Sequence, residues 1–355
     1  MKYTKLGKTD IDISRICLGT MTWGQQNTQD EAFKQMDCAL EKGVNFWDTA
    51  EMYPVPKIAE KYGKTEEIIG NWIASRAKRE EVVLATKISP LTWARGEEQP
   101  KINKQTILTA VDNSLKRLNT DYIDLYQLHW PTNRPYHHHA NGRDFIPAIG
   151  NQKKEHILSN IHETLETFDS LVKAGKIKHI GLSNDSSWGI SQFCHLAEKY
   201  NLPRIQSVQN EYNLTRRRDE LNVLESCALE ELSYLGWSPL SQGVLSGQYF
   251  DGKIPSKSRL AIAIRDGIEY ELSWRITPTC NQAIEEYHAV AKKYNLDFYQ
   301  MAIAFTLRRE YLSCSIVGAS SLSQLKSNIA AVDLELSEEV LNDIEKIYSK
   351  YPDPF

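Results

Sequence analysis

The alternation of short apolar runs with longer amphipathic stretches is the feature that most constrains the fold of this 355-residue chain. Eight runs have the length and apolar content of strands that are buried on both faces. They are RICLGT (15–20), VNFWDTA (44–50), VVLATK (82–87), YIDLYQLH (122–129), IKHIGLSN (177–184), RIQSVQNEY (204–212), YLGWSPL (234–240) and CSIVGAS (314–320). Stretches such as 28–43 and 64–78, between these runs, carry apolar residues three and four apart, which is typical of amphipathic helices. The repeated order of strand and helix indicates parallel strands joined by helical crossovers.

Eight such units predict an α/β fold, specifically a closed (β/α)8 TIM barrel. No linker or low-complexity tract divides the sequence, so residues 1–355 are expected to form a single domain. Residues 3–16 contain two short β-like runs around a Gly-Lys-Thr-Asp turn, and we expect a β-hairpin that closes the N-terminal face of the barrel. The long stretches after QLHW and SPLSQG predict enlarged loops on the opposite, C-terminal face, where barrel active sites lie.

Composition argues for a small-molecule partner. The chain has 41% hydrophobic and 25% charged residues and a net charge of -4, which gives no electrostatic reason to expect nucleic acid or an anionic membrane. No signal-type segment opens the chain, and no apolar run approaches the ~18 residues of a membrane span, which favours a cytoplasmic protein. Six scattered cysteines without a C-x-x-C pair favour reduced core thiols over a disulfide framework. The oligomeric state stays open.

Polar residues stand at the ends of three consecutive predicted strands. Asp48, Lys87 and His129 end the second, third and fourth strands, and Tyr53 follows Asp48 by five residues. Each residue alone has an ordinary structural explanation, such as a helix cap, a solvated cation or a packed aromatic ring. Together they are expected to meet at the C-terminal rim of the barrel, which serves function more than stability.

These residues resemble the aldo-keto reductase family, and the resemblance runs from LGTMTWG (18–24) to GASSLSQLKSNI (318–329). Within that family, WDTAEMYPVP, DLYQLHWP, AGKIKHIGLSN and the ending YPDPF are similar to the bacterial Tas-type reductases. The resemblance implies reversible reduction of an aldehyde or ketone by NADPH. It also implies that Asp48, Tyr53, Lys87 and His129 form the catalytic tetrad.

The chemistry of carbonyl reduction fits these residue types. Hydride addition creates an alkoxide that needs a proton, and a tyrosine with its ordinary pKa near 10 is a poor donor at neutral pH. An ammonium about 4 Å away stabilises tyrosinate by up to about 4 kcal/mol at an effective dielectric constant near 20. We therefore expect Lys87 to lower the pKa of Tyr53, Asp48 to hold Lys87, and His129 to orient the carbonyl.

The sequence lacks both a G-x-G-x-x-G motif after a strand and a G-x-x-x-x-G-K-[ST] motif. The resemblance implies instead that the nicotinamide lies across the strand ends. The implied contacts are Gly19, Thr20 and Met21 beneath the ring, Ser183, Asn184 and Gln209 at the carboxamide, and Trp237 as a stacking face. For Ser183 and Asn184, capping of the next helix is the alternative.

The rest of the cofactor is expected to contact two later segments. The stretch SPLSQGVLSG resembles a pyrophosphate-binding loop, with a plain surface turn as the alternative, and a helix N-terminus is expected after Gly318. The implied residues are Ser238, Leu240, Gln242 and Gly243 around the pyrophosphate, Arg259 as the family's loop arginine, Gly318 before a helix start that suits a phosphate, and Ser320, Gln324 and Asn328 around the adenosine. Many family members have an arginine where this chain has Gln324, although Lys326 could compensate. The resemblance thus predicts NADPH as the cofactor, and because Gln324 carries no charge, NADH stays possible.

Aromatic walls are expected for the substrate pocket, with Trp23 and Trp130 flanking the tetrad and residues 131–154 covering it. The run YHHHANGRD holds three adjacent histidines, but neighbouring loop residues seldom converge on one ion, so no metal is expected. Two functional classes stay open. One is an enzyme with a small carbonyl substrate, and the other is a nucleotide-binding redox sensor that resembles the potassium-channel β subunits.

Overall fold

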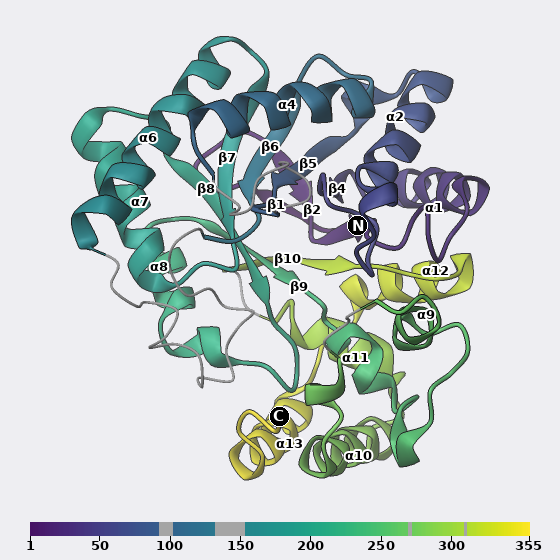
Figure 1. Cartoon of the computed structure of the whole chain (residues 1–355). Helices are drawn as coiled ribbons and strands as arrows, with labels where there is room; N and C mark the ends of the chain where they lie inside the picture. Colours follow the sequence, from purple (N-terminus) through teal and green to yellow (C-terminus); the bar gives the residue numbers. More distant parts are fainter. Residues whose placement is uncertain (92–101, 132–152, 269–271, 309–310) are drawn as a thin grey trace.

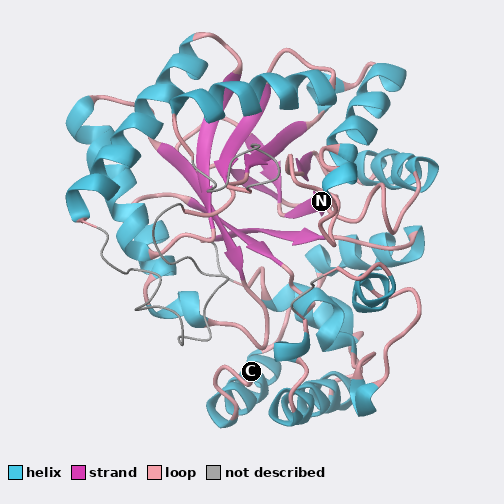
Figure 2. Cartoon of the chain, in the orientation of Figure 1, coloured by secondary structure: helices cyan, strands magenta, loops and turns pink. Residues whose placement is uncertain are grey.

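Eight parallel strands close into a barrel in the order β10-β3-β4-β5-β6-β7-β8-β9 (Figures 1 and 2). The computed structural model describes residues 1–355 except 92–101, 132–152, 269–271 and 309–310. The strands are β3 (Ile16–Gly19), β4 (Phe46–Asp48), β5 (Val83–Ile88), β6 (Ile123–Leu128), β7 (Ile177–Ser183), β8 (Ile205–Glu211), β9 (Ser233–Trp237) and β10 (Leu312–Val317). Each overlaps one of the eight predicted runs, so the predicted (β/α)8 fold is confirmed.

A ring of helices surrounds the barrel, one after each strand (Figure 1). They are α1 (Gln29–Glu41), α2 (Lys64–Arg76), α4 (Lys104–Leu118), α6 (Lys154–Lys173), α7 (Ser187–Tyr200), α8 (Val223–Leu229), α11 (Phe298–Phe305) and α12 (Leu322–Ala330). The connection from β9 to α11 also contains α9 (Arg259–Arg265) and α10 (Pro278–Lys293), and α13 (Glu338–Lys350) follows α12. Figure 1 shows α10 and α13 together at the edge of the ring, where Lys293 Nζ lies 2.7 Å from Asp343 Oδ2. None of the described helices is both long and apolar enough to cross a membrane.

A β-hairpin closes the N-terminal end of the barrel, as predicted. Strands β1 (Tyr3–Lys5) and β2 (Asp12–Ser14) pair antiparallel. Gly7 N donates to Ser233 Oγ at 2.9 Å, and Ser14 N donates to Asn45 Oδ1 at 2.8 Å, so the hairpin is attached where β9 begins and just before β4. The side chains of Leu6 and Ile13 are fully buried within the barrel core.

The barrel interior changes from apolar to polar along the strands. Successive strand residues point to opposite faces, so residues two apart share the interior. The apolar interior cluster consists of Leu6, Ile13, Cys17, Phe46, Ala85, Leu125, Leu235, Cys314 and Ile316. Two residues further along β4, β5 and β6 stand the buried polar residues Asp48, Lys87 and Gln127. The hairpin and the apolar interior cluster thus fill the N-terminal half of the barrel interior, below a layer of polar residues at the C-terminal rim.

Packing between α2 and α4 allows no side chain at Gly70. A Cβ atom at this position would lie 2.1 Å from the backbone oxygen of Arg117 and 2.8 Å from the backbone carbon of Leu118. Because backbone atoms cannot move aside cheaply, Gly70→Ala should separate the two helices and lower the free energy of unfolding by about 1–3 kcal/mol. Gly236→Ala is the control, since its Cβ would meet Tyr212 Cβ at an ordinary 3.6 Å. Urea unfolding of both variants checks this; equal stability would contradict the packing account.

Candidate active site

A buried ion pair between β4 and β5 forms the base of the candidate site. Lys87 Nζ lies 2.6 Å from Asp48 Oδ2, and the two side chains are 0% and 3% exposed. The same ammonium donates to Thr49 O at 2.7 Å. The second carboxylate oxygen, Asp48 Oδ1, accepts from Gln209 Nε2 at 2.8 Å and Gln127 Nε2 at 3.3 Å. The pair and the two glutamines that bind it thus come from four strands, β4, β5, β6 and β8, and these partners make the burial of two charges tolerable.

Tyr53 lies beside the ion pair. Lys87 Nζ is 5.1 Å from the centre of the Tyr53 ring, which is almost completely buried. Burial raises the pKa of Tyr53 above its ordinary value, and the Lys87 ammonium opposes that rise without cancelling it. For Lys87, burial acts to lower the pKa, but Asp48 and Tyr53 outweigh it and the pKa is raised. The net direction for Tyr53 is thus opposite to the expected one, because desolvation outweighs the charge.

His129 joins Tyr53 at the same rim. It follows the last residue of β6, and its main-chain N–H donates to Ile88 O at 2.9 Å. Its ring lies edge-on to Tyr53, with ring centres 5.8 Å apart, and its centre is 4.8 Å from that of Trp130. The structure therefore brings all four predicted tetrad residues together, with Trp130 beside them.

The residues expected beneath the nicotinamide end β3 or follow it. Gly19 pairs with Asp48 in register, and an added Cβ would lie 2.9 Å from Ile316 Cγ2, so only glycine fits. Thr20 Oγ1 donates to Asp48 O at 2.9 Å, and Met21 O accepts from Val55 N at 2.8 Å. These bonds hold the β3 end against the segment that carries Tyr53.

The carboxamide contacts expected at β7 and β8 also meet at this rim. Ser183 Oγ donates to Gln209 O at 2.8 Å, and Asn184 Nδ2 donates to His129 O at 2.8 Å. The other amide atom, Asn184 Oδ1, is buried and has no hydrogen-bond partner within the described part of the chain. Neither Ser183 nor Asn184 caps the following helix, because Ser186 is the N-cap of α7. An acceptor is thus left at the rim where a nicotinamide carboxamide would need one.

The loop after β9 holds an unusual backbone conformation. Ser238, Ser241 and Gln242 have φ angles of 55°, 48° and 57°, and Gly243 has 94°. Non-glycine residues rarely adopt this left-handed region, and such turns direct main-chain N–H groups into anion-binding hollows. Ser241 and Leu245 are fully buried within the short helix η5 (Ser241–Ser246), so this segment is not a plain surface turn.

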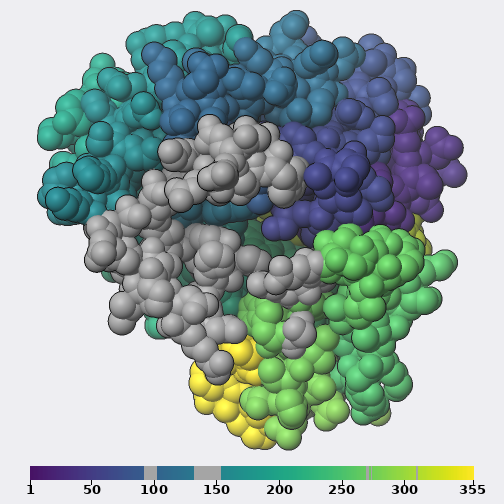
Figure 3. Space-filling model, viewed as in Figure 1, coloured from purple at the N-terminus to yellow at the C-terminus, as the bar shows by residue number. Residues whose placement is uncertain are grey.

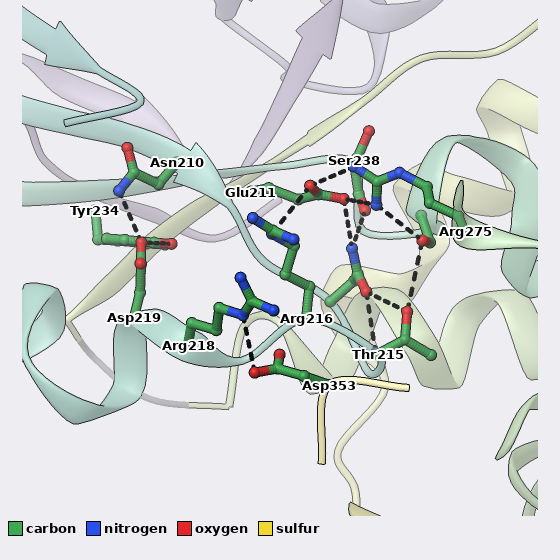
Figure 4. Close-up of polar contacts among 12 residues, drawn as sticks. Asn210, Glu211, Thr215, Arg216, Arg218, Asp219, Tyr234, Ser238, Arg275 and Asp353 are labelled. Carbon is green, nitrogen blue, oxygen red and sulfur yellow. Dashed lines mark hydrogen bonds and ion pairs between the residues drawn. The ribbon is translucent and has the colours of Figure 1, made fainter. Parts of the chain in front are cut away.

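A second buried ion pair anchors that loop (Figure 4). Arg275 makes two contacts with Glu211, Nη1 to Oε1 at 2.5 Å and Nη2 to Oε2 at 2.7 Å, and both residues are buried. Asn213 Nδ2 donates to Glu211 Oε1 at 3.2 Å and to Ser238 O at 3.0 Å. Arg275 Nη1 lies 3.4 Å from Ser241 Oγ. Glu211, at the end of β8, is thereby connected through Asn213 to Ser238 and through Arg275 to Ser241 of this loop.

Residues 353–355 cover the outer side of this ion pair. The Phe355 ring centre lies 5.2 Å from the Arg275 guanidinium and 5.0 Å from the Trp274 ring centre. Pro354 O accepts from Thr277 Oγ1 at 2.8 Å. The C-terminal segment YPDPF thus packs against Trp274 and Arg275, and Arg275 in turn contacts the loop after β9.

Arg259 begins α9 and faces the β3 end. Its Nη1 lies 3.8 Å from Met21 Sδ, and Gln26 Nε2 donates to Lys257 O at 2.8 Å. In Figure 3 the green surface of the segment around α9 meets the blue surface of the segment that follows β4. Arg259 therefore stands at the same rim as Met21, although 238 residues separate them along the chain.

The last predicted cofactor segment lies between β10 and α12. Helix α12 begins at Leu322 with Ser321 as its N-cap, so a helix N-terminus follows Gly318 as predicted. Gln324 Oε1 accepts from Ser320 N at 2.9 Å and Ser320 Oγ at 2.8 Å, and Asn328 Nδ2 is 3.4 Å from Gly318 O. The predicted residues of this segment thus form two hydrogen-bonded pairs, Gln324 with Ser320 and Asn328 with Gly318.

Other expected site residues have different surroundings. Trp23 is fully buried in the main core, where Thr65 Oγ1 donates to Trp23 O, and it is not in the apolar cluster that contains Tyr53 and Trp130. The structure therefore places Trp23 in the packing against the outer helices and does not bring it beside Tyr53. Most of the expected covering loop, and the three adjacent histidines, fall outside the described residues. Among the described residues, no three His, Cys, Asp or Glu side chains gather as a metal site would require.

Several residues of the site were not predicted from the sequence. Gln127 stands two residues before His129 on one strand, so its polar side chain in an apolar run was a usable signal. Ser89, two residues after Lys87, offered a similar signal. Arg275 offered none, because it lies in the long connection between β9 and β10 and reaches Glu211 only in the folded chain.

Comparison with known proteins identifies the family of this chain. Residues 15–349 match the sequence model of the Aldo/keto reductase family. The chain therefore belongs to the aldo/keto reductase family and is an oxidoreductase.

Individual relatives align along nearly the whole chain. Protein tas of Escherichia coli is 35% identical over 361 aligned residues, which cover 100% of this chain and 99% of that protein. An uncharacterized oxidoreductase of Bacillus subtilis, YrpG, is 30% identical, with 98% of this chain and 96% of that protein covered. Versiconal hemiacetal acetate reductase of Aspergillus parasiticus is 26% identical, with coverage of 98% and 97%.

The Glu211–Arg275 pair predicts a stability test. Glu211→Gln removes the carboxylate that faces both buried guanidiniums and should lower the free energy of unfolding by about 3–5 kcal/mol, whereas Arg275→Met should cost less, because Arg216 Nε still lies 3.4 Å from Glu211 Oε2. The double variant should cost less than the sum of the two single changes, because both single changes break the same Arg275–Glu211 contact. Urea unfolding of the wild type and the three variants measures this coupling. Additive losses would mean that the pair contributes little beyond packing.

Proposed function

We propose that this aldo/keto reductase reduces aldehydes or ketones to alcohols with NADPH, with Tyr53 as the proton donor. The observation that carries the proposal is the buried Lys87–Asp48 pair beside Tyr53 at the C-terminal rim. A proton donor must be protonated before transfer and must tolerate negative charge afterwards. Burial favours the protonated phenol, and the nearby ammonium lowers the energy of the tyrosinate.

The residues act in sequence on the carbonyl oxygen. His129 and Tyr53 donate hydrogen bonds that fix the oxygen, and Trp130 limits the space beside them. The bound nicotinamide supplies the hydride. As negative charge develops on the oxygen, the Tyr53 hydroxyl transfers its proton, and Lys87, held by Asp48, stabilises the remaining tyrosinate. Alcohol oxidation uses the same groups in reverse.

The chain offers groups that fit a nicotinamide dinucleotide. The buried Asn184 Oδ1 without a partner among the described residues would accept from the carboxamide amine. Gln209 donates through Nε2 to Asp48, so its amide oxygen is the atom left to serve the carboxamide. Gly19, Thr20 and Met21 at the end of β3 would lie beneath the nicotinamide ring, and Trp237 would stack against it. The left-handed turn at Ser238–Gly243 and the start of α12 would bind the phosphates.

NADPH is the proposed cofactor, with NADH as a weaker alternative. Gln324 stands where an arginine would hold the 2′-phosphate, and its amide oxygen is bonded to Ser320. Phosphate recognition would then depend on neutral donors and on Arg259. All six cysteines are free and buried, which is compatible with the proposed location in the reducing cytoplasm. The proposed partner is a small carbonyl compound.

Tyr53→Phe removes the proposed proton donor and keeps the aromatic ring. Carbonyl reduction should fall by about 10²–10⁴-fold, while the Kd for NADPH should stay within about twofold of the wild type. Loss of NADPH absorbance with a panel of aldehydes and ketones measures the first quantity, and fluorescence titration the second. Tyr299→Phe, at a partly exposed tyrosine, is the matched control.

Two outcomes would change the assignment. Full reduction by Tyr53→Phe would remove Tyr53 from the chemistry. Wild-type protein that retains oxidised cofactor without turnover, and that copurifies with a partner, would favour the redox-sensor function instead.

Gln324→Arg should increase the preference for NADPH over NADH. A new charge-assisted contact with the 2′-phosphate is worth about 1.5–3 kcal/mol, or roughly ten- to more than a hundredfold in relative affinity. Because the substitution also removes the acceptor of Ser320, Gln324→Met is the control for that loss. Both nucleotides are titrated against all three proteins at one ionic strength. Equal shifts for NADPH and NADH in the arginine variant would show that residue 324 is not at the phosphate.

A further inference from the structure

Ser89 contacts the ring of His129 on the side of Nδ1. Its Oγ lies 2.8 Å from that nitrogen, and both residues are buried. The contact is set by neighbouring strands, since Ile88 pairs with Leu128 in register and His129 N donates to Ile88 O. Ser89 and His129 therefore leave β5 and β6 at matching heights, and their side chains meet across the rim.

The partner of one imidazole nitrogen decides where the single proton of a neutral ring sits. A hydroxyl that donates to Nδ1 leaves the proton on Nε2. A substrate carbonyl oxygen has only lone pairs and can bind only a nitrogen that carries hydrogen. The partner of Nδ1 therefore decides whether His129 can donate through Nε2.

A buried carboxylate fixes the main chain of Ser89. Glu51 is fully buried; its Oε1 accepts from Ser89 N at 2.7 Å, and its Oε2 accepts from the Tyr62 hydroxyl. The Glu51 N–H in turn donates to Lys87 O at 3.3 Å. Both carboxylate oxygens of Glu51 accept hydrogen bonds, one from the Ser89 main chain and one from the Tyr62 hydroxyl. Glu51 thus braces the segment 87–89, which carries both Lys87 and the partner of His129.

We propose that Ser89 is a positioning residue that donates to Nδ1 of His129 and thereby keeps the proton on Nε2, with Glu51 holding Ser89 in place. This rests on the proposed role of His129 as a donor to the carbonyl. Ser89 touches neither substrate nor cofactor in this account and acts only through His129. Its loss should affect carbonyl reduction without affecting nucleotide binding.

Ser89→Ala and Ser89→Thr form the main test, because threonine keeps the hydroxyl. The alanine variant should lose about tenfold in kcat/KM for the carbonyl, the effect of one hydrogen bond, with the Kd for NADPH unchanged. The threonine variant should recover most of that loss. Ser14→Ala is the control, since Ser14 is a buried serine at the other end of the barrel whose Oγ donates to Ile16 O.

Nitrogen-15 chemical shifts of the His129 ring give a readout independent of activity, with the signals assigned by their absence in His129→Gln. The wild type should show protonated Nε2 and unprotonated Nδ1, and Ser89→Ala should show a mixture of tautomers. Glu51→Gln, which keeps an oxygen for Ser89 N–H, should behave like the wild type. An unchanged tautomer in Ser89→Ala, or no recovery by threonine in either readout, would overturn the proposal. If the wild type reduces no carbonyl, the proposed function fails, and the nitrogen shifts alone decide the Ser89 contact.

Discussion

An ammonium placed inside a closed barrel is the constraint on which the candidate site depends. An unpaired charge at the position of Lys87 would be prohibitively costly, so the fold must supply partners at fixed distances. Asp48 and Thr49 O supply them directly, and Gln209 and Gln127 hold the carboxylate from β8 and β6. These hydrogen-bond partners converge only because the sheet closes, which makes barrel closure and the ion pair mutually dependent.

The same arrangement explains the state of Tyr53. The hairpin and the apolar interior cluster keep water from the floor of the site, so electrostatic interactions above it are strong. Burial away from water also disfavours charged groups. For Tyr53 this desolvation penalty exceeds the stabilisation of tyrosinate by the Lys87 ammonium, so the pKa of the phenol is raised. A phenol that stays protonated at neutral pH but faces a fixed ammonium is suited to give up its proton only when a strong base forms beside it.

Glu211 and Arg275 repeat this principle at the neighbouring strand end. There a buried pair holds a loop in a strained conformation, with Asn213 bonded to Ser238 and the Arg275 guanidinium near Ser241. Strain of this kind persists only where the surroundings enforce it. Arg275, just before α10, and Phe355, which packs on it, thus support the candidate cofactor site, although neither residue belongs to the barrel. In the proposal for His129, Ser89 and Glu51 are a third example of buried polar groups that fix the position of a site residue.

The sequence by itself determined the barrel and the set of groups at its rim. Strand runs alternating with amphipathic helices leave few other folds, and residues that end consecutive strands must meet at one edge, so Asp48, Lys87 and His129 were predictable. Their partners were not, because periodicity gives the face of a residue but not its neighbour. Gln209 reaches Asp48 across 161 residues, and Arg275 reaches Glu211 from the short connection between α9 and α10, which the repeat of strands and helices does not place. Trp23 illustrates the converse: its position after β3 suggested a pocket wall, yet helix packing buried it. The balance of desolvation and charge at Tyr53 was likewise decided by the tertiary structure, since burial depends on how the whole chain packs.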